Sequence, residues 1–221
     1  MRSDSTEQDY RDLYYGGARH CVDVFRPARF VFASSTGVFQ YDDGRVCDDD
    51  SPRTPDANAR TKAMVDAEDV VLANPHGVGL VARLGGLYGS DRGFLISSLR
   101  SGKASLDADG GLRHMNFIWR EDAVSALLAL ATQPALERSA AFNVVDNGGV
   151  TQHDYLRFLC AELQLEMPAK GAPNPAKRHG IGNKRVVATR LKQLCGWQPS
   201  MPTLIDGLKA LLEAEQTPAR L

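Results

Sequence analysis

The chain has 221 residues, of which 43% are hydrophobic and 24% charged, a composition typical of a folded globular protein. Its net charge is −1 and its isoelectric point about 6.5, which argues against a nucleic-acid-binding surface. No apolar stretch is long enough to span a bilayer, and the four cysteines lack the spacing of a metal site. We therefore expect a cytoplasmic protein with no metal, no nucleic acid and no membrane as partner.

Strands and helices alternate along residues 1–150. Short, continuous apolar runs, typical of strands buried on both faces, predict three strands, at residues 30–33, 78–84 and 141–145. Helical patterns cover residues 8–24, 59–72, 94–100 and 121–132, the last with Asp122 as its expected cap. Strands separated by helices indicate an α/β fold with a parallel sheet and right-handed crossovers.

The last third, residues 151–221, is helical in pattern. Thr151 and Asp154 resemble a capping pair that opens a helix. Two shorter helices are predicted at residues 189–194, stopped by Gly196, and at 203–212. We expect a small helical lobe joined to the α/β core in one compact unit.

Three hydroxyl side chains follow the first apolar strand directly: Ser34, Ser35 and Thr36. In an open α/β sheet ligands bind at the carboxyl ends of the strands, so these hydroxyls are expected to face a substrate crevice. An alternative remains open, in which they only cap the turn that follows the strand.

The segment FVFASSTGVF, residues 30–39, resembles the strand-Ser-Ser-x-x-Val-Tyr segment of the extended short-chain dehydrogenases/reductases of the NAD(P)-dependent epimerase/dehydratase type. Four further segments resemble that family in the expected order, and together they extend the resemblance over essentially the whole chain. They are VARLGGLYG (81–89), NFIWRED (116–122), FNVVD (142–146), and NKR (183–185) with LCGW (194–197).

This resemblance implies a partial Rossmann-like sheet. Residues 1–150 would form an incomplete core holding the last strands of the doubly wound sheet, and residues 151–221 the substrate lobe. The family opens with a strand, Gly-x-x-Gly-x-x-Gly and a helix, which holds the cofactor's pyrophosphate. Nothing before Phe30 matches this start, so we expect an N-terminally truncated member whose first strand presents an unpaired edge.

Catalysis in the family rests on Tyr-x-x-x-Lys, in which the lysine lowers the tyrosine pKa, together with a serine or threonine that orients the substrate oxygen. By position Ser35 and Lys62 match the serine and the lysine, and they are the candidate catalytic residues. Asn58 stands where the tyrosine would be, and an amide does not deprotonate as a phenol does. The chain is most similar to an atypical branch that lacks the tyrosine.

The resemblance also implies ligand contacts. NAD or NADP would meet Ser34, Thr36, Lys62, Arg83, Gly85 and Gly86, and the substrate would meet Thr36, Asn116 and Arg120. A solvated or salt-bridged role for the two arginines stays open.

Two functions from different classes follow from these residues. The first is an NAD(P)-linked epimerase, dehydratase or oxidoreductase-like protein acting on a nucleotide sugar or a similar polar carbonyl compound. The alternative is a non-catalytic remnant or binding module that does not hold a dinucleotide by itself. The choice between NAD and NADP stays open, as does a homodimer.

Overall fold

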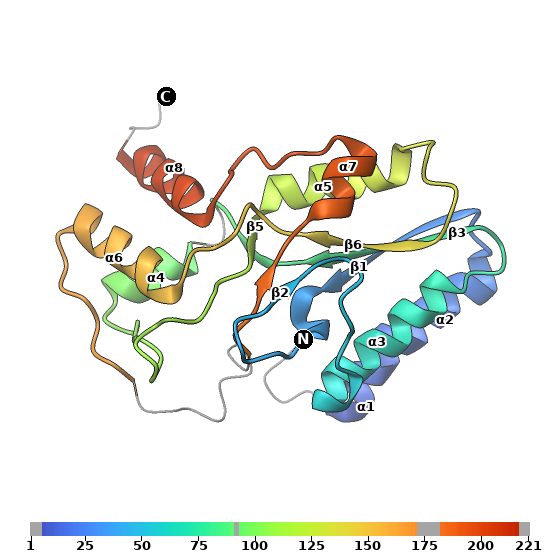
Figure 1. Ribbon diagram of the computed structural model, residues 1–221, viewed down its shortest axis with the longest axis horizontal. Helices are drawn as coiled ribbons and strands as arrows, with labels where there is room; N and C mark the ends of the chain where they lie inside the picture. Colours follow the sequence, from blue (N-terminus) through green and yellow to red (C-terminus); the bar gives the residue numbers. More distant parts are fainter. Residues whose placement is uncertain (1–5, 91–92, 172–181, 217–221) are drawn as a thin grey trace.

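A sheet of three parallel strands forms the centre of the computed structural model, which describes residues 6–90, 93–171 and 182–216 (Figure 1). The strands are β1 (Arg29–Ser35), β3 (Val78–Leu84) and β6 (Ala140–Val144), in the order β1-β3-β6. This confirms the three predicted strands and their parallel arrangement. The register aligns Ser35 with Leu84 and Leu84 with Val144, so all three strands end at the same edge of the sheet.

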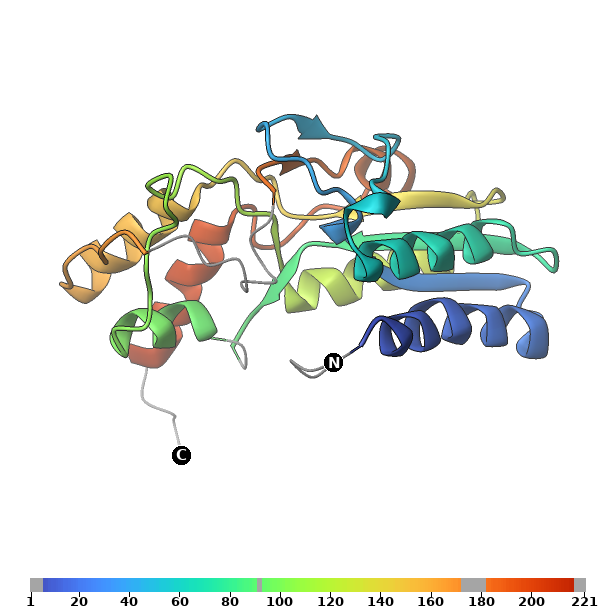
Figure 2. The same cartoon turned by 90° about the horizontal axis from the view of Figure 1, so that it is seen from below.

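Helices cover both faces of this sheet (Figure 2). One face carries α3 (Ala59–Leu72) and, beside it, a helix that begins at Glu7 and ends at Phe25. That N-terminal helix contains α1 (Glu7–Tyr10) and α2 (Gly17–His20), with wider π-helical turns at Arg11–Gly16 and Cys21–Phe25. The other face carries α5 (Arg120–Thr132) and α7 (Thr189–Cys195).

The side chains of β3 alternate between the two helical layers, as the pleat of a strand requires. Val81 is buried with Ala67 of α3, whereas Leu80 and Ala82 are buried with Leu130 of α5. Because both faces are covered, the strand has no polar positions along residues 79–82. This is why a continuous apolar run predicted it correctly.

Asp122 does not cap α5, contrary to the expectation from the sequence. The helix begins at Arg120, and Asp122 lies within its first turn. The buried carboxylate of Asp122 instead accepts the backbone N–H groups of Ser200 and Met201, at 2.8 and 3.0 Å. It therefore fixes the chain between α7 and the last helix, α8 (Leu204–Gln216), against the sheet layer.

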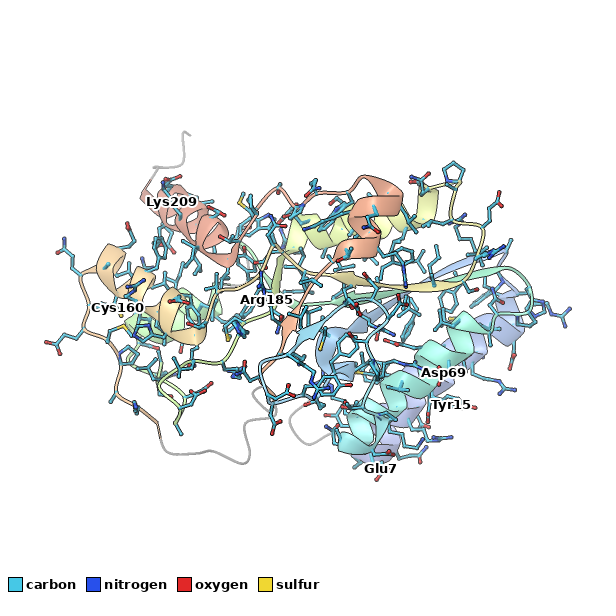
Figure 3. The ribbon with its side chains drawn as sticks, viewed as in Figure 1. Glu7, Tyr15, Asp69, Cys160, Arg185 and Lys209 are labelled. Carbon is cyan, nitrogen blue, oxygen red and sulfur yellow. The ribbon has the colours of Figure 1, made fainter. Side chains whose placement is uncertain are left out.

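A second hydrophobic cluster lies beyond the carboxyl edge of the sheet. It is built from α4 (Phe94–Arg100), α6 (Gln152–Leu163), α8 (Leu204–Gln216), β4 (Gly86–Tyr88) and β5 (Phe117–Trp119). Figure 3 places Cys160 and Lys209 in this part and Asp69 on the α3 side of the molecule. The predicted capping pair at the start of α6 is confirmed, since Thr151 and Asp154 exchange hydrogen bonds.

β1 lies at an edge of the sheet, because no other strand in the described part of the chain pairs with its far side. Its side chains are mostly half-buried, whereas residues 79–83 of β3 are all buried. The open edge expected from the sequence is thus present in the described residues.

Across the same residues, no helix combines the length and apolar character needed to cross a membrane.

Gly79 offers a direct test of how closely β3 packs against α3. A Cβ atom at this position would stand 1.7 Å from the carbonyl oxygen of Val71. We therefore expect Gly79→Ala to lower the free energy of unfolding by at least about 2 kcal/mol, measured by urea denaturation. Gly17→Ala is the matched control, because nothing lies within 4 Å of its Cβ position in the helix. It is expected to raise the free energy of unfolding by about 0.5–1 kcal/mol. Equal effects of the two substitutions would contradict this packing.

Candidate functional site

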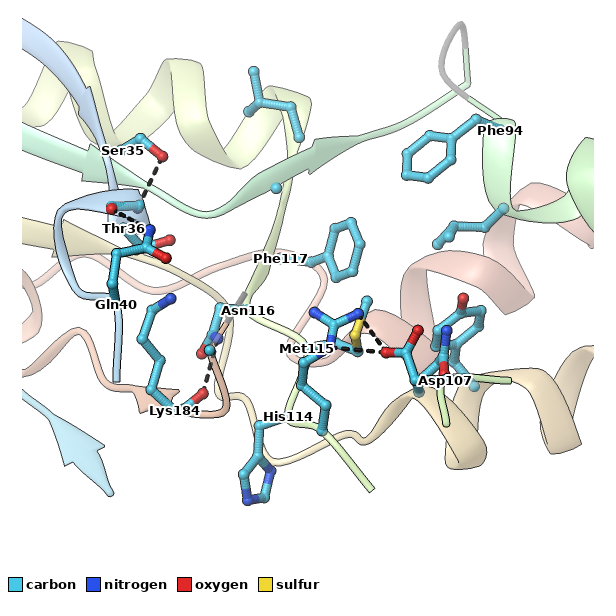
Figure 4. Close-up of a pocket in the computed structure, with 18 of the residues that line it drawn as sticks. Ser35, Thr36, Gln40, Phe94, Asp107, His114, Met115, Asn116, Phe117 and Lys184 are labelled. Carbon is cyan, nitrogen blue, oxygen red and sulfur yellow. Dashed lines mark hydrogen bonds and ion pairs between the residues drawn. The ribbon is translucent and has the colours of Figure 1, made fainter. Parts of the chain in front are cut away.

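A pocket of about 560 Å³ lies at the carboxyl edge of the sheet, between the end of β1 and the helical part of the molecule (Figure 4). This volume is in the range of small-molecule binding sites. The pocket is lined by the residues that follow β1, by residues 113–117 leading into β5, and by single side chains from other elements.

The end of β1 places two of the three predicted hydroxyls in this pocket. Ser35 and Thr36 line it, whereas Ser34 is buried and donates to a carboxylate oxygen of Glu68 at 2.6 Å. The Ser35 Oγ accepts the N–H of Gly37 at 3.0 Å, so it caps the short turn after the strand. Because that contact uses Oγ as an acceptor, the hydroxyl hydrogen is available to a ligand oxygen. Ser35 therefore fits both interpretations of the sequence, as a turn cap and as a pocket residue.

The lining carries more positive than negative charge. It contains three basic side chains, Arg60, Arg113 and Lys184, besides His114, but only one acidic side chain, Asp107. Arg113 pairs with Asp107 at 2.9 Å. Within the described part of the chain, no acid forms an ion pair with Arg60 or Lys184. Such a surplus of positive charge in a concave site favours an anionic ligand.

Lys184 is a pocket residue that the sequence analysis did not single out. The residue is 9% exposed, and burial lowers the pKa of its amine to about 8, with the nearby Arg113 guanidinium acting in the same direction. Asn116 holds its backbone: the Asn116 amide donates to the Lys184 carbonyl at 2.9 Å and accepts the Val186 N–H at 2.7 Å. The signal in the sequence was the family-like segment at residues 183–185.

The other wall of the pocket is largely apolar. Phe94 and Phe117 lie with their ring centroids 6.4 Å apart, and Met115 adjoins them. Tyr155 also lines the pocket, and burial raises its pKa to about 12. Near neutral pH it is a protonated phenol, which donates a hydrogen bond but does not act as a base.

The residues matched to the family's acid/base pair lie elsewhere. Lys62 is exposed on α3, does not line the pocket, and places its Nζ 3.2 Å from the Asp66 carboxylate. Asn58 caps α3, since its side-chain oxygen accepts the Thr61 N–H at 2.9 Å. The structure thus brings Ser35 to the pocket but does not bring Lys62 with it.

Arg83 and Arg120 both have the salt-bridged role that the sequence left open. Arg83 is buried with its guanidinium 2.9 Å from Glu68, and it also donates to the Asp49 carbonyl at 3.1 Å. Arg120 pairs with its neighbour Glu121 on the outside of α5. Neither lines the pocket.

The two predicted glycines, Gly85 and Gly86, lie at the start of β4 and pack against the segment that leads into β5. Gly86 lines the pocket, and a Cβ there would stand 2.8 Å from the Phe117 ring. A Cβ on Gly85 would stand 2.9 Å from the Asn116 carbonyl oxygen. Both positions are therefore restricted to glycine by packing alone.

The predicted dinucleotide contacts do not form one surface. Thr36 and Gly86 line the pocket, but Ser34 and Arg83 are engaged by Glu68, and Lys62 by Asp66. The residues matched to the cofactor by resemblance therefore do not form a dinucleotide site by themselves, and no chemical step through NAD or NADP follows from this arrangement. Nor do three His, Cys, Asp or Glu side chains gather as metal ligands in the described ranges.

Comparison with known proteins gives structural similarity without a sequence match. No family model and no curated protein matches the chain. A conserved protein of unknown function from Silicibacter pomeroyi is 28% identical, with a TM-score of 0.75 over 93% of this chain and 73% of that one. A protein from Methylobacillus flagellatus, described as an NAD-dependent epimerase/dehydratase, is 25% identical, with a TM-score of 0.74 over 96% of this chain and 74% of that one.

A more distant solved structure was determined with both ligands bound. UDP-glucuronic acid 4-epimerase from Bacillus cereus, in complex with UDP-glucuronic acid and NAD, is 17% identical, with a TM-score of 0.76 over 93% of this chain and 68% of that one. The chain is thus structurally similar, over most of its length, to NAD-dependent epimerases and dehydratases of the extended short-chain dehydrogenase type. Its α/β fold with a parallel sheet resembles their Rossmann-like fold.

The buried pair of Arg83 and Glu68 is expected to dominate the stability of the sheet layer. Arg83→Met leaves the Glu68 carboxylate, which is fully buried, without its closest guanidinium. We expect a loss of about 3–5 kcal/mol in the free energy of unfolding, measured by urea denaturation. The double variant Arg83→Met/Glu68→Met removes the uncompensated charge and is expected to recover part of the loss.

Lys62→Met is the control for this experiment. Its ion pair with Asp66 is exposed, so the free energy of unfolding is expected to change by less than about 0.5 kcal/mol. If Arg83→Met lowered the free energy of unfolding as little as Lys62→Met, the buried pair would not make the large contribution to stability expected of it.

Proposed function

We propose that the pocket binds a nucleotide sugar or a similar phosphate-bearing carbonyl compound, as the substrate side of an NAD(P)-linked epimerase- or dehydratase-like protein. The observation that carries this proposal is a positively charged pocket of suitable volume at the carboxyl edge of a parallel sheet. The Bacillus cereus epimerase of similar fold holds UDP-glucuronic acid and NAD.

The two walls of the pocket suit the two halves of such a ligand. Arg60 is the side chain best suited to phosphate oxygens, because a guanidinium group binds them in a bidentate manner; Arg113 also lines the pocket but is paired with Asp107. The rings of Phe94 and Phe117 offer a flat apolar surface for a base or a sugar face. The Ser35 hydroxyl, at the end of β1, would donate to a sugar oxygen.

A second candidate function is a binding module without oxidoreductase chemistry. It is favoured by the placement of Asn58 as a helix cap and of Lys62 in an exposed ion pair. In that case the chain binds the sugar nucleotide but neither holds a dinucleotide nor transfers a hydride.

Calorimetric titration of the folded chain separates these functions. We expect saturable binding of UDP-glucose or UDP-glucuronic acid, and Ser35→Ala is expected to weaken it about three- to tenfold, the contribution of one neutral hydrogen bond. Ser101→Ala is the matched control, because Ser101 is exposed at the end of α4 and does not line the pocket.

Parallel titrations with NAD(H) and NADP(H) decide between the two candidates. Binding of a sugar nucleotide together with a dinucleotide supports the NAD(P)-linked function, whereas sugar-nucleotide binding alone supports the binding module. A folded chain that binds no sugar nucleotide at all would rule out both.

A further inference from the structure

Lys184 differs from the other buried charged side chains of the described residues. The others, Asp49, Glu68, Arg83, Asp122 and Asp146, all have hydrogen-bond partners for their charged atoms. Lys184 is 9% exposed, yet in the described part of the chain no acceptor contacts its Nζ. Asn116 donates to the Lys184 backbone carbonyl, so the chain is held at this residue while its amine has no partner there.

The amine points into the pocket. Figure 4 shows the Lys184 side chain rising beside Asn116 toward Gln40 and Thr36, at the end of β1. These three neighbours are neutral, so none of them compensates a positive charge. The short pairing of β2 (Val46–Cys47) with β7 (Arg185–Val186) holds the backbone from the other side, which keeps the side chain aimed at the cavity.

A largely buried ammonium that faces a cavity without an ionic partner is energetically unfavourable, because burial removes most of its water and no anion replaces it. Two events relieve this: loss of the proton, or entry of an anion. With its pKa near 8, the amine is still largely charged at neutral pH, so the first event does not take place there. The second event requires a ligand, and the surplus positive charge of the lining attracts one of the right sign.

We propose that Lys184 pairs with an anionic group of the ligand, a carboxylate or a phosphate, and makes a negative charge at that point a condition for tight binding. The proposal deepens the function proposed above and rests on it only for the sugar-nucleotide character of the rest of the ligand. Asn116 is then a positioning residue, since it holds the Lys184 backbone with one hydrogen bond and the Val186 backbone with another.

The first test compares stability and anion binding in Lys184→Met. Removing an unpaired buried charge is expected to raise the thermal midpoint of the ligand-free chain by about 2–4 °C. Sodium pyrophosphate and sodium glucuronate are the two probes, one for each source of anion. At least one of them is expected to raise the midpoint of the wild type, and its effect is expected to be largely lost in Lys184→Met.

The matched control is Lys209→Met, which removes an exposed lysine of α8 (Figure 3). It is expected to respond to both anions as the wild type does, which excludes a general effect of positive charge. Should Lys184→Met not fold, Lys184→Gln serves in its place, and Lys184→Arg is expected to retain the response.

A pH series gives an independent signature. Glucuronate is the probe, because its carboxylate stays ionised throughout. The anion binds the protonated amine, so affinity is expected to be constant below pH 8 and to fall up to tenfold per pH unit above it. Arg60, Arg113, Asp107, His114, Cys47 and Tyr155 are the other charged or titratable groups around this point. Any pH dependence that persists in Lys184→Met belongs to them.

The responses to the two anions identify the chemical group that pairs with Lys184, or exclude such a group. A response to pyrophosphate alone identifies a phosphate as the partner of Lys184, and a response to glucuronate alone identifies a carboxylate. A Lys184-dependent response to simple anions in a chain that binds no UDP-sugar would support this inference while rejecting the proposed function. If neither anion acts through Lys184, in Lys184→Met or in the Lys184→Gln variant that replaces it, the inference is overturned.

Discussion

The buried contact between Arg83 and Glu68 joins the elements on which the pocket depends. Glu68 of α3 is fully buried and receives hydrogen bonds from Ser34 of β1, Arg83 of β3 and Arg53. A carboxylate is tolerated at such a depth only when all its donors are in place. The helix therefore docks on the two strands in a single register. Because Ser34 is one of these donors, the contact also holds the end of β1, where the pocket residues Ser35 and Thr36 follow.

Elements buried on both faces, or bounded by strong caps, could be predicted from the sequence. β3 and α3 have the predicted bounds, because residues 78–82 of the strand are an unbroken apolar run and Asn58 caps the helix. The strands β2, β4, β5 and β7 span two or three residues each and have no periodicity to detect. The Lys184 backbone is hydrogen-bonded to Asn116, which lies far away in the chain, and no local pattern in the sequence predicts such a contact.

The catalytic candidates Ser35 and Lys62 show that a sequence resemblance locates some residues of a pocket and not others. Sequence order matched Lys62 to a family lysine, yet its surroundings are those of a solvated helix surface, with Asp66 one turn away. Ser35 kept its expected place because the end of a strand is set by the whole sheet rather than by one side chain. Similarity to solved epimerase structures therefore supports the fold. The chemistry depends on which side chains lie together in the pocket.

The open edge of β1 has a consequence for amide hydrogen exchange. Successive N–H groups of a parallel strand point to opposite sides, so every second amide of residues 29–35 faces β3 and the rest face outward. β3 has a strand on each side, and its amides are engaged in both directions. Deuterium uptake along β1 is accordingly expected to alternate between fast and slow positions, while β3 is protected throughout. The exchange pattern of β1 therefore shows whether the outer edge of the sheet is free of backbone hydrogen bonds in solution.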